Sequence, residues 1–287
     1  MKPIVVSILS DLHFDSHFPS SGVSEAMVRK FFDPIFNQGG IEPADVLIIA
    51  GDLGHDNQQS YTIIKMLREL YFKHIICVLG NHDYYMINQN ISARYEHDSF
   101  KRVNELRDLL NSIDGIYCLD GNVVEVEGIR FGGCDSWYDG AYSMWLYDPK
   151  RTKGDWVDSF WRMSMNDAAY IKGIKRFDEI WDIEKSKIES TYQQCDVMIT
   201  HVMPSIDPDH VDKRYRNDKA TGFFCFDGEK YLKNTTAHTW IYGHSHTNQD
   251  VEVHGVRMIA HQLGYRGETK NICEKRIEID IKNFDLK

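Results

Sequence analysis

The stretch that decides the fold is an apolar run that ends abruptly in polar residues, Ile75-Ile76-Cys77-Val78-Leu79-Gly80-Asn81-His82-Asp83. The run is short, rich in β-branched residues and closed by glycine, which predicts a buried strand followed by a turn. Four further runs end in the same way: Ile4–Leu9 before Ser10-Asp11-Leu12-His13, Val46–Ala50 before Gly51-Asp52, residues 197–200 before His201, and Thr239–Tyr242 before Gly243-His244-Ser245-His246. Because α/β proteins build their sites in loops at the carboxyl ends of strands, these polar residues are candidate functional groups.

Apolar residues at helical spacing predict helices between these strands, over 60–72, over 100–110 and, as one or two elements, over 165–194. Ser60 is the predicted N-cap of the first helix. Two hairpins are predicted around Glu127-Gly128 and His254-Gly255, and a last strand over 276–281. Early strand–helix alternation and late hairpins indicate a layered α/β domain with mixed sheets.

Composition excludes several classes of protein. The chain has 287 residues, 42% of them apolar, which suits two domains or one large domain with a sizeable core. Its early apolar run is too short for a membrane span or a signal peptide, so neither is expected. The six cysteines include no Cys-x-x-Cys pair, which favours reduced thiols in the cytoplasm. A net charge of −10 argues against nucleic acid as a partner, although a local site for a phosphate ester is compatible with it.

The polar residues at the five strand ends make up a mixed set of carboxylate, imidazole and amide ligands. The candidates are Asp11, His13, Asp52, Asn81, His201, His244 and His246, with His82 beside them. Such a set suits Mn, Fe, Ni or Zn better than Ca or Mg. Seven ligands are too many for one such ion, but they suffice for two ions that share a carboxylate. Paired metals clamp the attacking and leaving oxygens of a phosphoryl displacement, and a water between them loses its proton near neutral pH.

These blocks, in this order, resemble the calcineurin-like metallophosphoesterase superfamily over residues 4–267. The stretch Thr200-His201-Val202-Met203-Pro204-Ser205 is similar to the family's Thr-His-x-x-Pro segment. Met165-Asn166-Asp167 and Gly264-Tyr265-x-Gly267-Glu268 resemble segments of many small bacterial members. The resemblance implies a single domain over residues 1–287 with a four-layer α/β/β/α sandwich, in which two mixed β-sheets are flanked by helices.

The resemblance also implies a role for each candidate residue. The first metal would be held by Asp11, His13 and His246; the second by Asn81, His201 and His244; and Asp52 would bridge the two. The ions would be divalent transition metals, with Mn as the first choice and Fe, Zn or Ni as alternatives. Hydroxide between the ions would attack the phosphorus of a phosphomonoester or phosphodiester. His82, whose unperturbed pKa lies near working pH, would protonate the leaving oxygen as the general acid.

Two positions depart from the family pattern. Many members have an Asp three residues after the bridging Asp, where it orients the catalytic His, but this chain has His55 there. Asp56 and Asp83 are the candidate substitutes, so the sequence leaves open which group orients His82. The second departure is His261-Gln262, where similar chains tend to have Asn-Pro.

An aromatic segment at 135–162 stands apart from the rest of the chain. It holds four of the six tryptophans, with basic residues among them: Trp137, Trp145, Trp156 and Trp161, with Lys150, Arg151 and Lys153. Two interpretations are open, a surface insertion whose aromatics pack on one another and a lid over the site that faces an anionic substrate. A second basic group follows His201 and is either a solvated face or a phosphate contact: Lys213, Arg214, Arg216 and Lys219.

Together these features predict a metal-dependent phosphoric ester hydrolase, a phosphatase or phosphodiesterase, that acts on a small phosphate ester in the cytoplasm. The alternative is a catalytically inactive binding or scaffold protein on the same fold. That alternative requires missing ligands, and all seven are present. The natural substrate, the preference between monoester and diester, and the oligomeric state stay open.

Overall fold

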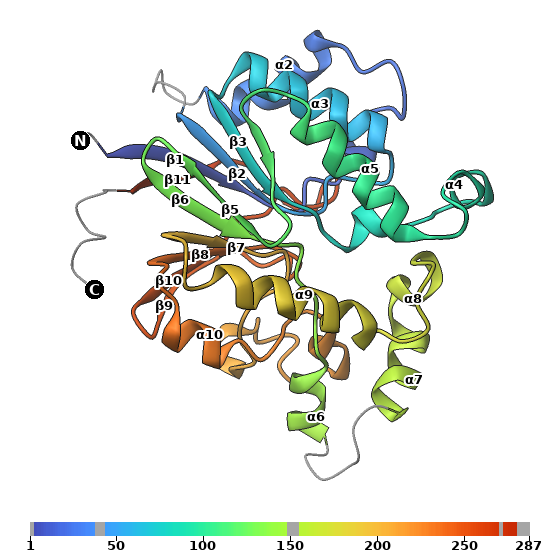
Figure 1. The fold of residues 1–287 in the computed structure, drawn as a ribbon. Coiled ribbons are helices and arrows are strands. Elements are labelled where there is room, and N and C mark those ends of the chain that lie inside the picture. Colours follow the sequence, from blue (N-terminus) through green and yellow to red (C-terminus); the bar gives the residue numbers. More distant parts are fainter. Residues whose placement is uncertain (1–2, 38–43, 148–154, 270–271, 280–287) are drawn as a thin grey trace.

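The computed structural model describes residues 3–37, 44–147, 155–269 and 272–279. Two β-sheets lie face to face, and helices cover the outer side of each, as Figure 1 shows. This is the predicted four-layer α/β/β/α sandwich of two mixed sheets.

Within the described residues the first sheet has the strand order β11-β1-β2-β3-β4. These strands are β1 (Ile4–Leu9), β2 (Val46–Ala50), β3 (His74–Val78), β4 (Ile116–Cys118) and β11 (Lys275–Ile279). Strands β1 to β4 run parallel, and β11 pairs antiparallel with β1.

The second sheet has the order β5-β6-β7-β8-β10-β9 in the same part of the chain. Its strands are β5 (Asn122–Val126), β6 (Ile129–Gly133), β7 (Val197–Ile199), β8 (Thr239–Tyr242), β9 (Gln249–Val253) and β10 (Val256–Ala260). The central strands β6, β7, β8 and β10 are parallel, and both predicted hairpins, β5–β6 and β9–β10, form at its edges.

Strand β2 shows why the strands read as unbroken apolar runs. Val46, Ile48 and Ala50 point into the core between the two sheets. Leu47 and Ile49 belong to the core beneath the helices. All five residues are buried. A strand that is covered on both faces has no solvent-exposed side, so its sequence shows no alternating polar residues.

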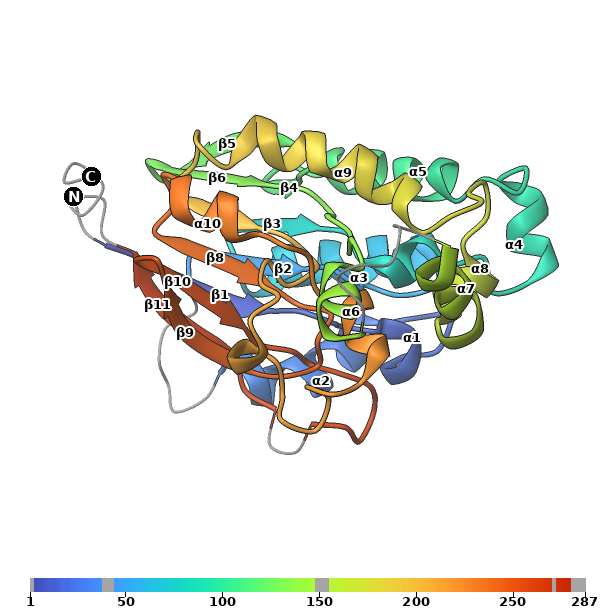
Figure 2. The ribbon, with the colours of Figure 1, turned by 90° about the horizontal axis from the view of Figure 1, so that it is seen from below.

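Helices form the outer layers. Figures 1 and 2 show α2 (Glu25–Phe36), α3 (Asn57–Leu70) and α5 (Ser99–Asn111) over the first sheet, and α9 (Asp178–Thr191) and α10 (Glu229–Asn234) over the second. The other helices of the described residues are α1 (Phe14–His17), α4 (Gln89–Arg94), α6 (Ala141–Tyr147), α7 (Asp155–Ser164) and α8 (Asn166–Tyr170), with the 3₁₀ turns η2 (Asn81–Tyr84), η3 (Pro208–His210) and η4 (Lys219–Phe223). The predicted helical segment 165–194 thus forms two elements, α8 and α9.

The predicted N-cap of α3 was wrong. The helix begins three residues earlier than expected, and the side chain of Asp56 accepts a hydrogen bond of 2.8 Å from the backbone N–H of Gln59. Ser60 lies buried inside the helix. A carboxylate caps a helix as well as a hydroxyl does, so Asp56 takes the role.

The polar strand ends converge at one edge of the sandwich. Leu9 pairs with Ile49, and Ile49 with Cys77, so the first three strands end level with one another. In the second sheet Ile199 is level with Ile241. A hydrogen bond of 2.8 Å from the backbone N–H of Gly243 to the carbonyl of His201 continues the alignment beyond the strands.

Two composition-based expectations concern the chain as a whole. The six cysteines are all free thiols, five of them buried and Cys273 exposed. No helix in the described residues combines the length and apolar character that crossing a membrane requires.

Candidate metal centre

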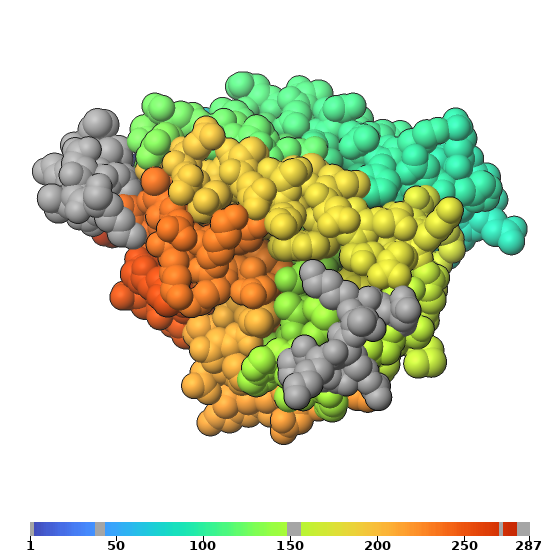
Figure 3. All heavy atoms as spheres, turned by 60° about the horizontal axis from the view of Figure 1, so that its bottom comes forward, coloured from blue at the N-terminus to red at the C-terminus, as the bar shows by residue number. Residues whose placement is uncertain are grey.

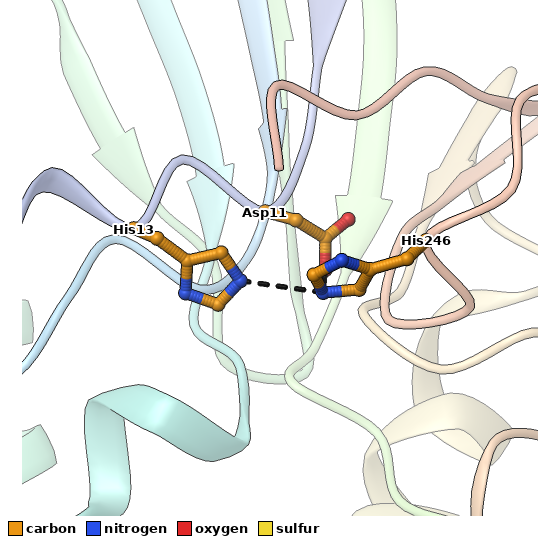
Figure 4. Close-up of side chains that lie close together, drawn as sticks. All are labelled: Asp11, His13 and His246. Atoms are coloured by element: carbon orange, nitrogen blue, oxygen red, sulfur yellow. Dashed lines mark hydrogen bonds and ion pairs between the residues drawn. The ribbon is translucent and has the colours of Figure 1, made fainter. Parts of the chain in front are cut away.

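All seven predicted ligands lie together at this edge, in two groups. The first group is Asp11, His13 and His246, whose side chains point toward one another in Figure 4. The Nε2 atoms of His13 and His246 are 3.3 Å apart, and His246 Nε2 lies 3.7 Å from Asp11 Oδ1. One ligand atom from each of the three residues lies within 4.8 Å of the others.

The second group contains Asp52, His201 and His244, which also bring one ligand atom each within 4.8 Å of the others. Asn81 joins it, because its Oδ1 lies 3.1 Å from His201 Nε2. All four residues are buried, so the group sits at the floor of the site.

Asp52 lies between the two groups and presents one carboxylate oxygen to each. Its Oδ1 is 3.3 Å from His201 Nε2 in the second group, and its Oδ2 is 3.8 Å from His13 Nε2 in the first. Its exposed fraction is 1%. This is the placement that a bridging carboxylate requires.

The turns that carry these ligands have an unusual backbone. Left-handed φ angles occur at five of the predicted ligands: Asp11 (52°), His13 (40°), Asp52 (57°), His244 (65°) and His246 (47°). Residues with a Cβ adopt this region at a cost of order 1–3 kcal/mol each, and such strain gathers at functional sites. This backbone strain is the cost of turning these side chains inward directly after the strands.

Two glycines make room for the ligands. A Cβ atom at Gly80 would lie 2.2 Å from Asp52 Oδ1, and one at Gly51 would lie 2.4 Å from His201 Nδ1. Both distances are far below van der Waals contact. This explains physically why glycine precedes Asp52 and Asn81 in the sequence.

Three of the histidines are held in a single tautomer by a partner outside the cluster. His201 donates from Nδ1 to the carbonyl of Ala50 at 2.8 Å, and His244 donates from Nε2 to the carbonyl of Phe223 at 2.9 Å. His246 donates from Nδ1 to the carboxylate of Glu268 at 2.9 Å. A carbonyl or carboxylate oxygen only accepts, so the other ring nitrogen of each histidine faces the cluster and is the one that would bind a metal, as in metal-binding histidines.

Asn81 is oriented in the same manner. Its Nδ2 donates to Asp167 Oδ1 at 2.8 Å, so its Oδ1 must face the cluster. The carboxylate of Asp167 also accepts hydrogen bonds from the hydroxyls of Tyr85 and Tyr138. In the sequence, Asp167 and Glu268 stand out only as members of family-like segments, and no local pattern predicts these contacts.

Electrostatics favour neutral imidazoles at two positions. Burial lowers the pKa of His13 well below its usual value, and burial together with His201 lowers the pKa of His244 to about 3. At His201 burial also acts to lower the pKa, but the Asp52 carboxylate outweighs it and raises the pKa to about 10. Carboxylate, amide and imidazole ligand atoms from both groups of residues converge here. The donor set therefore fits two divalent transition-metal ions.

His82 lies beside the cluster at the end of a hydrogen-bonded chain of side chains. Asp15 Oδ2 is 2.9 Å from His55 Nδ1, and His55 Nε2 is 2.9 Å from His82 Nδ1. His82 Nε2 is 3.1 Å from the hydroxyl of Tyr265, whose ring stacks on His13 at 4.0 Å. The group that orients His82 is therefore His55, backed by Asp15.

Neither predicted substitute orients His82. Asp56 caps α3, as described above. Asp83 is buried and accepts hydrogen bonds from the backbone N–H groups of Leu53, Gly54 and Gly80, which ties the loops after β2 and β3 together. His55 occupies the position of the expected carboxylate, and an imidazole needs a further acceptor behind it, which Asp15 provides.

The aromatic segment is more deeply buried than a surface insertion. Trp137, Tyr138, Tyr142 and Trp161 belong to the hydrophobic core, whereas Trp145 is 50% exposed. Figure 3 shows the light-green residues of α6 beside the orange residues that follow β7, where Ser143 Oγ donates to the carbonyl of Lys219 at 2.7 Å. Lys150, Arg151 and Lys153 lie outside the described residues. The lid stays a prediction.

The second basic group is largely paired with carboxylates or aromatic rings. Arg214 bonds Asp212, and Arg216 lies 3.2 Å from Asp209. Lys219 Nζ lies over the Tyr147 ring, 4.8 Å from its centre. These contacts agree with the solvated-face interpretation.

Comparison with known proteins gives a consistent picture. The model of the family "Calcineurin-like phosphoesterase" matches residues 4–248. The "Uncharacterized protein L509" of Acanthamoeba polyphaga mimivirus is 23% identical over 252 residues, which span 80% of this chain and 82% of the viral protein. Among solved structures, the Phosphopantetheinyl Hydrolase (PptH) of Mycobacterium tuberculosis superposes with a TM-score of 0.66 at 16% identity, covering 93% of this chain and 91% of that one.

Proposed function

The chain belongs to the calcineurin-like phosphoesterase family, and from that premise we propose that it is an active, dinuclear metal-dependent hydrolase of a small phosphate ester. The observation that carries the proposal is the completeness of the site: seven ligand side chains in two groups, with Asp52 between them. An inactive scaffold protein would be under no demand to keep the strained turns and fixed tautomers of this site.

In this proposal the first ion is held by Asp11, His13 and His246, and the second by Asn81, His201 and His244, with Asp52 shared. We take manganese as the physiological metal. When bound, two such ions acidify a water and neutralise the negative charge that develops on the phosphoryl oxygens. The six unpaired cysteines support a reducing compartment, and we place the protein in the cytoplasm.

The proton for the leaving oxygen is assigned to His82. In the neutral chain of hydrogen bonds, Asp15 accepts from His55 Nδ1, so His55 Nε2 accepts from His82 Nδ1. This arrangement leaves His82 Nε2 facing Tyr265, at the open side of the site. Uptake of a second proton on Nε2 converts His82 to an imidazolium, whose Nδ1–H is held by His55 and Asp15 and whose Nε2–H is aimed at the departing oxygen.

The test uses purified protein loaded with Mn²⁺. Elemental analysis is expected to approach two ions per chain, and the loaded protein is expected to hydrolyse 4-nitrophenyl phosphate or bis(4-nitrophenyl) phosphate. Their relative rates would assign the enzyme as a phosphatase or a phosphodiesterase. A protein that holds two ions and hydrolyses neither ester would support the scaffold alternative, and a fully loaded protein with one ion would contradict the dinuclear site.

A further inference from the structure

We propose that a pocket beside the first metal group binds the organic part of the phosphate ester, and that this part is not anionic and carries an N–H or O–H donor. The proposal rests on the function proposed above, because it names the class of substrate for the same site.

The pocket has a volume of about 660 Å³ and reaches His246 and Glu268 at the edge of the metal centre. Pockets for small organic ligands typically have about 300–1,000 Å³, so it has room for much more than a phosphate. Its walls come from the residues after β7, β8 and β10, and they include the apolar side chains of Met203, Val211 and Phe224. An apolar body attached to the phosphate would therefore be buried here.

Gln262, which lines this pocket, has an unsatisfied acceptor. The residue is 7% exposed, and its Oε1 is buried without a hydrogen-bond partner among the residues that the structure describes. Buried polar atoms nearly always have a partner, so an orphan in a pocket points to a ligand atom. An amide oxygen only accepts, and the ligand must therefore supply a donor. Ser245 Oγ, between two ligand histidines, is a second lining atom in the same state.

The backbone holds Gln262 firmly in place. Its N–H donates to Asn248 Oδ1 at 3.0 Å, and the next N–H, of Leu263, donates to the carbonyl of Ser10 at 2.9 Å. The side chain is thus anchored next to the turn that carries Asp11.

The charges around the pocket argue against an anionic organic group. Arg214 forms a two-pronged ion pair with Asp212, with contacts of 2.8 and 3.1 Å. Glu268 is bonded to His246, and Asp218 accepts the backbone N–H of Ala220 at 2.8 Å. A second anionic group would find the Arg214 guanidinium already paired and the Asp218 and Glu268 carboxylates close by. A group that donates a hydrogen bond therefore fits better than an anionic one.

The experiment compares two phosphate esters whose organic groups differ in a single N–H donor. The probes are 3-acetamidopropyl phosphate and 3-acetoxypropyl phosphate, each also made as its 4-nitrophenyl diester so that either reaction class is covered. Mn²⁺-loaded wild type is expected to prefer the amide roughly tenfold in kcat/KM, through KM, because one hydrogen bond to a buried acceptor is at stake. A 3-hydroxypropyl probe separates hydroxyl from amide donors.

Variants assign the preference to Gln262. Gln262→Leu is expected to bring the amide-to-ester ratio close to one, whereas Gln262→Glu, which keeps an acceptor, retains the preference. Gln58→Leu makes the same exchange on the exposed side of α3 and is the matched control. A wild-type ratio near one, or a preference that survives in Gln262→Leu, would overturn the proposal.

A binding measurement covers the case in which Gln262→Leu fails to fold, and it separates this proposal from the proposed function. Calorimetry on loaded wild type is expected to show tighter binding of 3-acetamidopropylphosphonate than of the acetoxy analogue, without any turnover. Equal binding of the two overturns the pocket assignment. Hydrolysis of 4-nitrophenyl phosphate without discrimination between the two organic groups would remove the pocket alone, and discrimination in binding without hydrolysis would remove the proposed function alone.

Discussion

At the scale of single residues, Asp52 is the side chain that links the two halves of the candidate metal centre. Among the described side chains it is the one that faces both groups of candidate ligands, and its Oδ1 also accepts a hydrogen bond of 2.9 Å from the backbone N–H of His82. Its negative charge would offset the repulsion between two cations a few ångströms apart. The loss of this charge therefore affects both ions together.

Asp52→Asn is accordingly expected to lower kcat/KM by roughly 10²–10³-fold, the scale typical of a lost electrostatic group in an active site. Bound Mn²⁺, measured by elemental analysis, should fall below two per chain. His13→Ala, which removes one terminal ligand, is the comparison and should be milder. Near-normal turnover of Asp52→Asn beside an inactive His13→Ala would contradict the bridge.

His55 permits a test of how His82 is positioned. The hydrogen bonds of its ring run to Asp15 and His82 rather than to the seven ligands, so His55→Ala should leave metal content intact. It should lower kcat about tenfold or more for an alkyl phosphate, part of the 10²–10⁴ that general acid catalysis contributes. The loss should be small for 4-nitrophenyl phosphate, since nitrophenolate leaves without a proton.

Two further variants make the His55 experiment decisive. His55→Asp places a carboxylate acceptor beside His82 and should recover part of the lost kcat. His254→Ala, an exposed histidine paired with Glu229, is the control. Equal losses of kcat on both substrates would show that His55 helps to position the phosphate and does not act by orienting the proton donor.

At the scale of elements, the turns after the strands decide whether the ligands meet. Gly80 has an ordinary φ of −122°, so its importance is steric and not conformational. A methyl group there would meet Asp52 Oδ1 at 2.2 Å and His201 Cε1 at 2.7 Å. Neither atom has room to retreat inside a buried cluster.

Gly80→Ala is therefore expected to displace the bridging carboxylate and to lower bound Mn²⁺ to one ion per chain or fewer. Gly255→Ala is the matched control, because nothing lies within 4 Å of its Cβ position in the β9–β10 turn, although φ is +75°. The control should lose about 1–2 kcal/mol of unfolding free energy to left-handed strain and keep its metal. Full metal occupancy in Gly80→Ala would contradict the steric argument.

At the scale of the whole molecule, a buried charge network joins the helix layers across the sandwich. Arg107 of α5 pairs with Asp135 at 2.6 Å, and Lys187 of α9 pairs with Glu184 at 2.6 Å and with Asp120 at 2.5 Å. Asp120, Asp135 and Glu184 lie close enough to resemble a third metal group. Arg107 and Lys187 pair with these carboxylates instead, so we interpret the network as structural.

Glu184 makes the free energy of unfolding depend on pH. Burial, reinforced by Asp135, raises the pKa of Glu184 from 4.5 to about 7. A raised carboxyl pKa favours the folded state while the group is protonated, so this contribution is complete below pH 4.5 and is lost as the pH rises to about 7. Glu184→Gln mimics the protonated form and removes that loss.

The free energy of unfolding of Glu184→Gln minus that of wild type is expected to increase between pH 4.5 and 7 and to stay constant above pH 7. Urea unfolding of both metal-free proteins in chelator measures it, and exposed Glu69→Gln serves as the control. A difference that stays constant over this range would show that Glu184 does not titrate in the folded state.

The sequence by itself determined the strands and the chemistry that follows them. Apolar periodicity is local, so β2 and β3 can be read from ten residues each, and the side chains that follow them can be named before any contact is known. The ligand set was readable for the same reason, since Asp, Asn and His at the ends of parallel strands must share one edge. Local signals also compete, which is why Asp56 rather than Ser60 caps α3.

Only the tertiary structure decided which groups support those ligands. Asp15 and His55 are 40 residues apart and His55 and His82 are 27 apart, so no local pattern links them, and the sequence pointed to Asp56 or Asp83 instead. The carbonyls of Ala50 and Phe223 set two imidazole tautomers through backbone atoms that every residue has. An unsatisfied Gln262 likewise exists only once the chain has closed around it. The chemistry of a side chain follows from its residue type and can be read from the sequence, whereas its hydrogen-bond partners are determined only by the fold.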